Sequence, residues 1–311
     1  MKRAIITGGT GLIGRALAAE LASADYDVIV LTRNLEKATG FPVGVRAEEY
    51  DARSGESWAS LITSETAIIN LAGASIGPDG VLGLIGWRWT PTNKKIILQS
   101  RLNAGNAVVE AIKAASEKPE VVVQSSAIGY YGPHGDEMIT EETPPGEDFQ
   151  AEVCKQWEAA TAEVEEMGIR QVVLRTGIVM SPDGGVLPIL ALPVRLFVGG
   201  PIGSGKQWLS WIHIKDEVRA IRHLIEDESA SGPYNLTAPN PMTNGGFTRV
   251  VGSTLSRPTF LPAPGFAFKI AFGEAATLVL DGARVLPKRL ENAGFEFEYP
   301  DAGPALEDLL G

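Results

Sequence analysis

Short apolar runs recur along the first half of the chain, and longer segments with apolar residues three and four positions apart separate them. The runs are rich in Val, Ile and Leu and lie at 4–6, 28–31, 67–71, 121–123 and 171–174. Continuous apolar runs of this length are typical of strands that are buried on both faces of a sheet. We therefore predict strands at these five places.

The intervening segments keep their apolar residues on one face of a helix. The clearest sets are Leu12, Ile13, Ala16, Leu17 and Leu21; Val108, Val109 and Ile112, just before Ala115; and Phe149, Val153, Trp157, Ala160 and Val164. Strands that alternate with amphipathic helices form a mostly parallel sheet with helices on both faces. The pattern predicts an α/β fold built on a doubly wound parallel sheet.

The alternation of predicted strands and helices ends at about residue 177. Gly and Pro crowd the stretch 184–205, and strand candidates are reduced to 234–237 and 295–299. Helices are expected near Lys215, near Thr243 and after Pro304. We therefore expect a domain over 1–177 and a smaller α+β lobe over 178–311, with strands and helices that partly interleave with the first domain.

Composition and charge narrow the class of protein. The chain has 311 residues, of which 44% are hydrophobic, so it can build a packed core and is neither disordered nor fibrous. Its 27 basic and 38 acidic residues give a net charge of −11, which disfavours nucleic acid as a partner. The single cysteine, Cys154, excludes an intramolecular disulfide framework and fits a reducing compartment. The apolar run before the first glycines is too short for a signal peptide, and no stretch approaches the roughly 20 apolar residues of a membrane span. We expect a cytoplasmic protein without a membrane partner.

Three glycines lie between the first predicted strand and the first predicted helix. Gly8, Gly11 and Gly14 are three residues apart in the sequence IITGGTGLIG. This spacing allows a turn with positive φ, a close approach of the pyrophosphate to bare backbone, and tight packing of helix on strand. The helix start then offers free N–H groups to phosphates. The context predicts a dinucleotide-binding loop and disfavours a merely structural glycine turn.

The end of the second strand decides which dinucleotide is expected. An NAD enzyme places an acidic residue there, whereas this chain has Thr32, Arg33 and Asn34. A guanidinium suits a 2′-phosphate, so we favour NADP(H); the alternative is that Arg33 is simply a solvated strand-end residue. Asp51, at the end of the expected third strand, is a candidate to bind the adenine amino group of the cofactor. The segment 70–73 would end the fourth strand beside the cofactor.

A second glycine-rich segment, 200–206, has the glycine and lysine spacing of a nucleoside triphosphate loop. Gln207 stands where a Ser or Thr would hold magnesium, and the segment neither follows a clear strand nor opens a helix. We do not expect it to bind ATP.

Several long motifs carry a family resemblance. They are GGTGLIG, LTR, NLAG, RWTPTNKK followed by Ser100 and Arg101, SSAIGYYG, LRTGIV, GGPIGSGKQWLSWIHIKD, GPYNLTAP and LPKRLENAGFEF. The chain resembles the extended short-chain dehydrogenase/reductase superfamily, and more closely its atypical NAD(P)-dependent epimerase branch, the sugar-nucleotide epimerase-like proteins with a C-terminal domain of unknown function.

The resemblance implies a Rossmann-type domain that binds NADP(H), with a substrate cleft under the C-terminal lobe. The residues predicted to hold the cofactor are Gly8, Thr10, Gly11, Leu12, Ile13, Arg33, Asp51, Leu71, Ala72, Gly73, Thr176, Gly177 and Ile178. The superfamily often dimerises through helices such as those near 94–115 and 149–167, so a homodimer is a candidate assembly.

The catalytic residues of the superfamily carry over incompletely. Ser126 fits its serine and Lys155 its lysine, but the tyrosine position four residues before the lysine holds Ala151. That phenol normally moves the proton, so catalytic competence is in question. The candidate proton sources are then Tyr131, Lys155 or water. For Tyr130 and Tyr131 the alternative to acid–base work is that they line the pocket wall. Without a histidine in register, Cys154 is expected to be a small core residue.

Aromatic residues suggest a substrate pocket. We predict Trp89, Tyr130, Gln207 and Trp208 as substrate-binding residues, while the alternative is that the tryptophans only pack the two parts together. His213, three residues before Asp216, has no third ligand in register, so we expect no metal site and a structural hydrogen bond instead.

These observations predict an NADP(H)-dependent oxidoreductase or epimerase-like enzyme that acts on a carbonyl or hydroxyl of a small molecule, with a sugar nucleotide as one candidate. The rival hypothesis is a non-catalytic NADPH-sensing or scaffold protein that kept the nucleotide site and lost the chemistry, which Ala151 favours.

Overall fold

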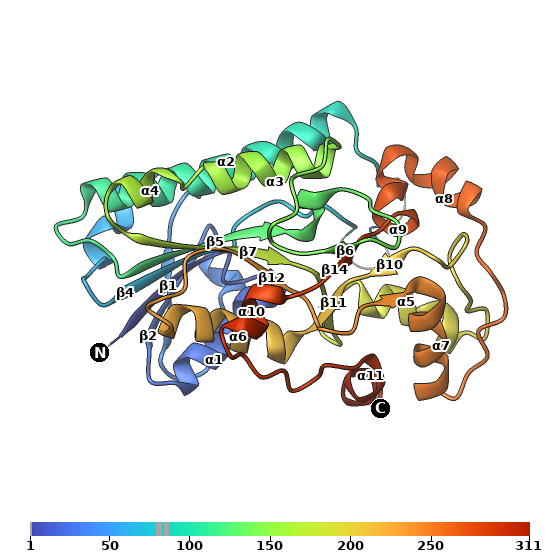
Figure 1. Ribbon diagram of the computed structural model, residues 1–311. Coiled ribbons are helices and arrows are strands. Elements are labelled where there is room, and N and C mark those ends of the chain that lie inside the picture. The colour runs from blue at the N-terminus through green and yellow to red at the C-terminus, as the bar shows by residue number, and fades with distance from the viewer. Residues whose placement is uncertain (1, 79–82, 84–86) are drawn as a thin grey trace.

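The central feature of the fold is a parallel sheet of seven strands (Figure 1). A computed structural model describes residues 2–78, 83 and 87–311. The strands of this sheet are β1 (Arg3–Thr7), β2 (Asp27–Thr32), β3 (Val45–Glu49), β4 (Thr66–Asn70), β5 (Val121–Ala127), β7 (Arg170–Thr176) and β12 (Gly232–Leu236). The five strands predicted from apolar runs and the one predicted at 234–237 are all present.

The strand order is β12-β7-β5-β4-β1-β2-β3, and every neighbouring pair is parallel. The chain therefore moves outward from β1 to β3, returns to β4 beside β1, and continues to the other edge. Ligands of doubly wound sheets bind at the carboxyl ends of the strands where the order reverses. Here that point lies between β1 and β4, so the turn after β1 lies where a ligand is expected.

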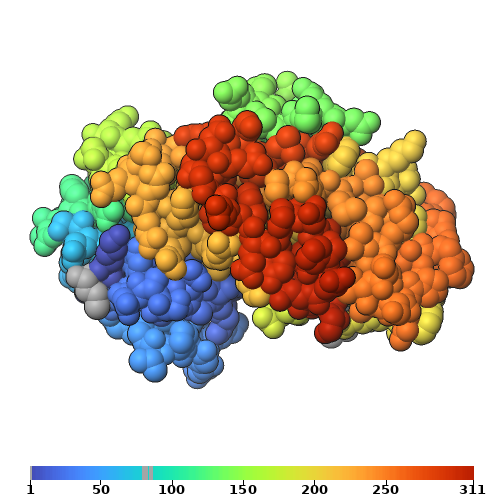
Figure 2. All heavy atoms as spheres, turned by 60° about the horizontal axis from the view of Figure 1, so that its bottom comes forward, coloured from blue at the N-terminus to red at the C-terminus, as the bar shows by residue number. Residues whose placement is uncertain are grey.

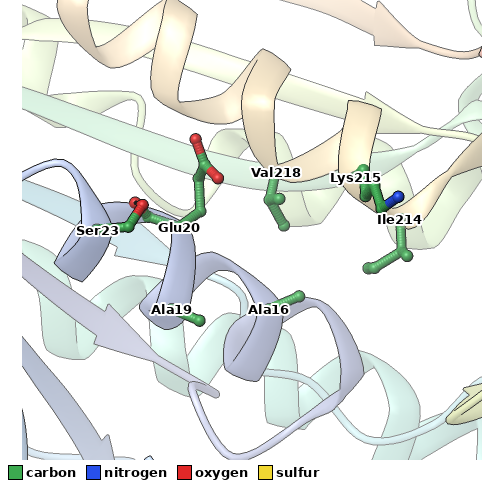
Figure 3. A pocket seen from close by; sticks show the side chains of 7 residues that line it. All are labelled: Ala16, Ala19, Glu20, Ser23, Ile214, Lys215 and Val218. Atoms are coloured by element: carbon green, nitrogen blue, oxygen red, sulfur yellow. Dashed lines mark hydrogen bonds between the residues drawn. The ribbon is translucent and has the colours of Figure 1, made fainter. Parts of the chain in front are cut away.

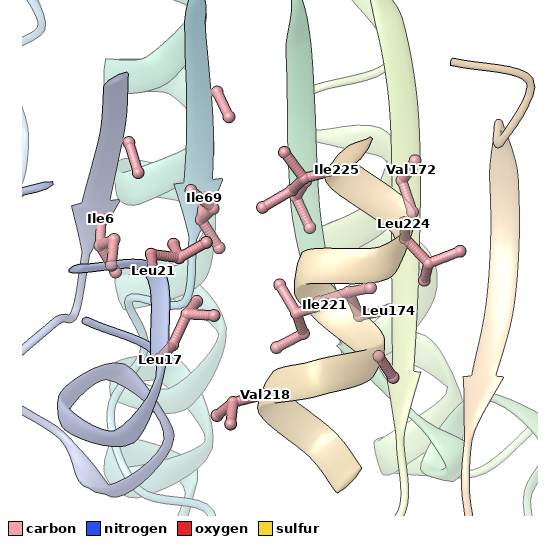
Figure 4. Packing of buried hydrophobic residues seen from close by; sticks show 14 of the residues in the cluster. Ile6, Leu17, Leu21, Ile69, Val172, Leu174, Val218, Ile221, Leu224 and Ile225 are labelled. Carbon is pink, nitrogen blue, oxygen red and sulfur yellow. The ribbon is translucent and has the colours of Figure 1, made fainter. Parts of the chain in front are cut away.

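Helices cover both faces of the sheet (Figure 1). They are α1 (Leu12–Ser23), α2 (Pro91–Ala114), α3 (Phe149–Ala159), α4 (Glu163–Glu166) and α6 (Ile214–Glu226). On one face, α1 and α6 bury Leu17, Leu21, Ile221 and Leu224 against the sheet (Figure 4). On the other face, α2 and α4 bury residues such as Ile112 and Val164. The purely apolar strands are explained by these two cores.

Most of the remaining chain forms a smaller region beyond the carboxyl ends of the strands, while α10 (Lys288–Asn292) packs beside β12 through Leu290. The strands of the smaller region are β6 (Met138–Ile139), β8 (Ile178–Ser181), β9 (Gly184–Gly185), β10 (Trp208–Leu209), β11 (Trp211–His213), β13 (Met242–Thr243) and β14 (Arg284–Val285). Its helices are α5 (Leu187–Arg195), α7 (Asn244–Thr254), α8 (Gly265–Phe272), α9 (Thr277–Leu280) and α11 (Ala302–Leu310). A separate apolar cluster that includes Leu187, Phe247 and Leu306 holds it together. Figure 2 shows the C-terminal segment, in red, lying between the N-terminal helices and the orange region around α7.

The three helices expected in the C-terminal part were confirmed, whereas the strand expected over 295–299 was not. Helices occur near Lys215, near Thr243 and around Pro304 as α6, α7 and α11. No strand forms over 295–299, because the N–H groups of Glu298 and Tyr299 donate to the Asp216 carboxylate, at 2.9 and 2.8 Å, in place of a neighbouring strand.

The predicted helix over 149–164 is interrupted. It ends at Ala159, and the short α4 follows after a turn that contains Thr161. The Thr161 hydroxyl, fully buried, donates to Gln124 at 3.1 Å and accepts from Gln171 at 2.7 Å. These contacts to β5 and β7 favour the turn over a continuous helix. Within the described ranges, no helix is long and apolar enough to cross a membrane.

Candidate functional site

The turn between β1 and α1 has the geometry that a phosphate loop needs. Gly8 has φ +71°, and a Cβ there would lie 2.9 Å from the backbone of Leu71 and Ala72. A Cβ on Gly14 would lie 2.5 Å from the Cα of Gly9, so this glycine lets α1 pack close to β1. Gly11 is the N-cap of α1, and none of the described side chains caps that helix. The N–H groups of the first turn are therefore available to an anion.

Arg33 and Asp51 follow the next two strands. Arg33 is exposed, and its guanidinium makes no hydrogen bond or ion pair within the described residues. It is thus free to meet a ligand phosphate. Asp51 accepts hydrogen bonds from the N–H groups of Ser54 and Arg53, both at 2.8 Å, and these lower the pKa of its carboxyl. One of its oxygens is engaged in this turn, and the other has no described partner.

The segment after β4 is held in place by α2. Leu71 and Ala72 are half-buried beside Gly8, and Gly73 is exposed. The N–H of Ala74 donates to Ser100 Oγ and its carbonyl accepts from Arg101, both at 2.9 Å. Arg101 also lies over the Trp157 ring at 4.5 Å, and burial lowers its pKa to about 10. The Ser–Arg pair in the family-like motif therefore positions the loop beside the glycine turn.

Ser126 is tied to a buried ion pair that the sequence analysis missed. Ser126 is 2% exposed, and its hydroxyl donates a hydrogen bond to Glu158 at 2.6 Å. Arg175 binds both oxygens of Glu158, at 3.0 Å each. Because the only proton of Ser126 is engaged, the remaining surface of this hydroxyl can accept a hydrogen bond but cannot donate one without breaking the bond to Glu158. Glu158 lies at an unremarkable helix position, so no spacing marked it.

The two adjacent tyrosines have different environments. Tyr131 is 1% exposed; its hydroxyl donates to Asn235 at 2.7 Å and accepts from Arg175 at 3.1 Å. Burial raises its pKa to about 12. Tyr130 is half-buried, its phenol makes no hydrogen bond to the described residues, and the Arg175 guanidinium lies 3.5 Å from its ring centroid. The geometry therefore leaves Tyr130, and not Tyr131, with a free phenol.

Lys155 and Cys154 lie on α3, beside the site. Lys155 is exposed enough to pair with Glu152 at 2.7 Å; this hydrogen bond raises its pKa, and the nearby Tyr130 adds to the shift. Cys154 is buried, its Sγ lies 3.6 Å from the Ala127 carbonyl, and burial raises the pKa of its thiol to about 11. It has the environment of a core residue. Ala151, at the expected tyrosine position, is fully buried.

A buried carboxyl lies under the end of β7. Thr176 donates to Glu217 Oε1 at 2.9 Å, whereas Glu217 Oε2 is buried with no partner among the described residues. Burial raises the pKa of Glu217 to about 8. The following hairpin of β8 and β9 reaches back to α1, since a Cβ on Gly185 would lie 3.2 Å from Leu12. The hairpin that follows Thr176, Gly177 and Ile178 in the chain therefore contacts the start of α1.

Three of the predicted substrate residues, Trp89, Gln207 and Trp208, have packing or hydrogen-bond partners within the chain. Trp89 is 7% exposed and packs edge-on against Phe149 at 5.0 Å, in a cluster that joins the two parts of the chain. Gln207 donates to the carbonyls of Ile202 and Val279, and Trp208 donates to Asp136. For Trp89 the packing alternative is the one this geometry favours.

Other chemical candidates have structural explanations. His213 is fully buried and its Nδ1 accepts from the N–H of Lys215 at 3.1 Å, which caps α6; burial lowers its pKa. In the ranges that the structure describes, no three metal-ligating side chains come together. The segment 200–206 is a turn that precedes β10 and opens no helix.

Two surface hollows lie away from the glycine turn. One, of about 300 Å³, lies between α1 and α6 and is lined by residues such as Ala16 and Val218 (Figure 3). The other, of about 630 Å³, lies beside α2 and includes Glu110 and Lys113. Both are on helix faces and neither contains a residue of the expected cofactor site.

A parallel sheet with this glycine turn at its switch point defines the class of dinucleotide-binding Rossmann-type proteins. The sequence profile of the NAD dependent epimerase/dehydratase family matches residues 4–237, and that of a domain of unknown function, DUF1731, matches residues 263–309. The chain belongs to the NAD dependent epimerase/dehydratase family.

Relatives and solved structures resemble the chain over its whole length. An Arabidopsis thaliana protein named epimerase family protein SDR39U1 homolog, chloroplastic, is 40% identical over 313 residues, covering 98% of this chain and 86% of that one. The crystal structure of human epimerase family protein SDR39U1 (isoform 2) with NADPH matches with a TM-score of 0.85 and 32% identity, covering 99% and 98% of the two chains. A nucleoside-diphosphate sugar epimerase from Corynebacterium glutamicum matches with a TM-score of 0.78 and 33% identity, covering all of this chain and 58% of that one.

Proposed function

We propose that the chain binds NADP(H) and acts as an oxidoreductase or epimerase-like enzyme on a carbonyl or hydroxyl of a small molecule, with a sugar nucleotide as one candidate. The observation that carries the proposal is the turn after β1, where Gly8 has φ +71° and α1 begins without a side-chain cap. The free guanidinium of Arg33 supports a 2′-phosphorylated dinucleotide. The human relative that was crystallised with NADPH supports the same cofactor.

The remaining cofactor contacts are proposed from their place around that turn. Thr10, Leu12 and Ile13 would present backbone to the pyrophosphate, and Ala72 with Gly73 would run along the ribose. Thr176, Gly177 and Ile178 would approach the nicotinamide. When bound, NADP(H) supplies or accepts the hydride.

The proton carrier that we propose is Tyr130. Its phenol makes no hydrogen bond to the described residues, so it is available to a substrate oxygen, and the Arg175 guanidinium lies 3.5 Å from the centroid of its ring. Tyr131 is a poorer candidate, because its hydroxyl already donates a hydrogen bond to Asn235 and accepts one from Arg175. Ser126, with its proton engaged by Glu158, would accept a hydrogen bond from a substrate hydroxyl. Ser126→Ala is then expected to abolish turnover while NADPH binding stays.

Stereospecifically deuterated NADPH, incubated with libraries of carbonyl compounds and sugar nucleotides, tests the chemistry. Label transfer that is lost in Tyr130→Phe and kept in Tyr131→Phe supports the proposal, and loss in Tyr131→Phe alone, with folding intact, contradicts the assignment of Tyr130.

A non-catalytic NADPH-sensing protein is the second candidate function. Ala151 at the tyrosine position favours it, and so does the engagement of Ser126 in an ion-pair network. Tight NADPH binding with no label transfer in any library would support this candidate. The homodimer and the cytoplasmic location expected from the sequence stay predictions.

A further inference from the structure

Large apolar side chains gather on the surface of the C-terminal region. We call this group of residues the apolar patch. Its members and their exposed fractions are Leu196 61%, Phe197 55%, Val198 55%, Phe260 72%, Leu261 44%, Phe266 67% and Ile270 70%. Two segments bring them together. The N–H of Leu261 donates to the Gly199 carbonyl at 3.1 Å, and the N–H of Ala263 donates to the Pro201 carbonyl at 2.9 Å. The patch is therefore one surface built from segments more than 50 residues apart.

Helix α8 presents apolar side chains on two sides and buries none of its residues fully. Phe268 and Phe272, four positions apart, face inward, and Phe272 packs against Trp87 at 6.1 Å. Arg88 donates to the carbonyls of Ile270 and Ala271, which ties the end of α8 to the segment before α2. The helix is thus anchored, and its outer face still exposes Phe266 and Ile270.

The two segments that carry the patch contain basic residues, and the first acidic residue after the second of them, Glu274, is paired with Lys94. Residues 184–215 contain three Lys or Arg residues and no Asp or Glu, and so do residues 229–273. Removing these six cations from the whole chain leaves 21 basic residues against 38 acidic ones elsewhere. Arg195, Arg257 and Lys269 are exposed within the segments of the patch. Arg257 also lies 4.5 Å from the Phe197 ring centroid. In an otherwise acidic chain, the segments of the apolar patch, around α5, α7 and α8 in Figure 1, therefore carry exposed basic residues.

We propose that the apolar patch docks on the surface of a lipid bilayer that contains anionic lipids. Exposed aromatic and aliphatic side chains mixed with basic residues bind interfaces by burying apolar area and by attraction to anionic headgroups. Charge argues against a second copy of the chain, because a symmetric contact would put cations against cations. The acidic remainder of the chain would be repelled by the same surface, which orients the protein with α8 toward the lipid. This binding is peripheral, so it needs no spanning helix, and it would revise the expectation of no membrane partner.

Sedimentation with vesicles tests the proposal on the full chain. Phosphatidylcholine vesicles that also contain phosphatidylglycerol are compared with vesicles of phosphatidylcholine alone, at low and high salt. We expect binding to the mixed vesicles, and binding at least about tenfold weaker without the anionic lipid or at high salt.

Two variants locate the contact. Phe266→Gln with Ile270→Gln is expected to weaken vesicle binding by at least about tenfold, and Arg257→Glu with Lys269→Glu by a similar factor. The matched control is Leu35→Gln with Val43→Gln, two apolar residues that are 47% and 100% exposed elsewhere, and it should bind as the unaltered chain does. Unfolding midpoints verify that each variant is folded.

Three results would overturn the proposal. One is absence of binding to the anionic vesicles; another is equal loss of binding in the control variant. The third is a lipid-free dimer that the Phe266 and Ile270 substitutions dissociate, which would assign the patch to a second copy. NADPH binding enters none of these readouts, so the outcome is independent of the proposed function.

Discussion

Replacing Glu217 with Gln tests the energetic cost of the buried carboxyl under β7. The side chain is fully buried, Thr176 is its one hydrogen-bond partner among the described residues, and burial raises its pKa from an ordinary 4.5 to about 8. As pH rises, the unfolded chain releases this proton near pH 4.5, whereas the folded chain keeps it until about pH 8. The folded state therefore binds more protons in between, and stability falls as pH rises through this window.

The magnitude follows from the width of that window. One pKa unit corresponds to about 1.36 kcal/mol, so a shift of this size costs on the order of 3 to 5 kcal/mol of stability above pH 8. Gln has the same shape and no charge, and it can still accept the Thr176 hydrogen bond. We expect Glu217→Gln to match the unaltered chain within about 1 kcal/mol at pH 5 and to exceed it by about 3 kcal/mol or more at pH 8.

Urea unfolding at a series of pH values between 5 and 9 measures the difference directly. The control is Glu228→Gln, an exposed carboxyl just beyond α6, which should show no such divergence. If the stability of Glu217→Gln ran parallel to that of the unaltered chain across the series, Glu217 would be ionised in the folded state and the reasoning would be refuted.

Other substitutions test the remaining packing and polar contacts. Gly14→Ala places a Cβ 2.5 Å from the Gly9 Cα. We therefore expect a loss of about 1–3 kcal/mol in the free energy of unfolding, and NADPH binding that is at least about tenfold weaker by titration. The control Gly303→Ala, whose Cβ would have no neighbour within 4 Å, should show neither effect. Arg175→Met leaves the carboxylate of Glu158 without its cation, and chemical denaturation should show a loss of about 3–5 kcal/mol. The double variant Glu158→Gln with Arg175→Met should recover part of that loss, and additive losses would refute the coupling of the pair.

Sequence patterns were sufficient for six strands of the central sheet and for the glycine turn because each depends on local information, whereas the exposed edge strand β3 (VRAEE) has no apolar run. Buried parallel strands need continuous apolar runs, and the turn at Gly8 needs a residue that tolerates positive φ. The strand expected at 295–299 failed for a nonlocal reason. Its alternating Phe295 and Phe297 do face a core, but the adjoining backbone is bound by Asp216, about 80 residues earlier in the chain.

The buried polar network around Glu158 and Arg175 could not be predicted from the sequence, because its contacts are also nonlocal. Glu158 and Arg175 meet only because α3 packs over β5, the neighbour of β7, and the burial of Glu217 depends on how α6 covers the sheet. The sequence could nominate Ser126 and Tyr131 but not the partners that engage their hydroxyls. The apolar patch likewise requires two distant segments to meet.

The central claim is that the β1–α1 turn, with Arg33, binds a 2′-phosphorylated dinucleotide, and calorimetric titration tests it most directly. NADPH and NADH are titrated into the unaltered chain, into Arg33→Ala, and into Arg53→Ala as an exposed control. We predict that NADPH binds more tightly than NADH, and that this preference falls at least about tenfold in Arg33→Ala and persists in Arg53→Ala. If neither NADPH nor NADH bound, or if the preference for NADPH survived in Arg33→Ala, the claim would be contradicted.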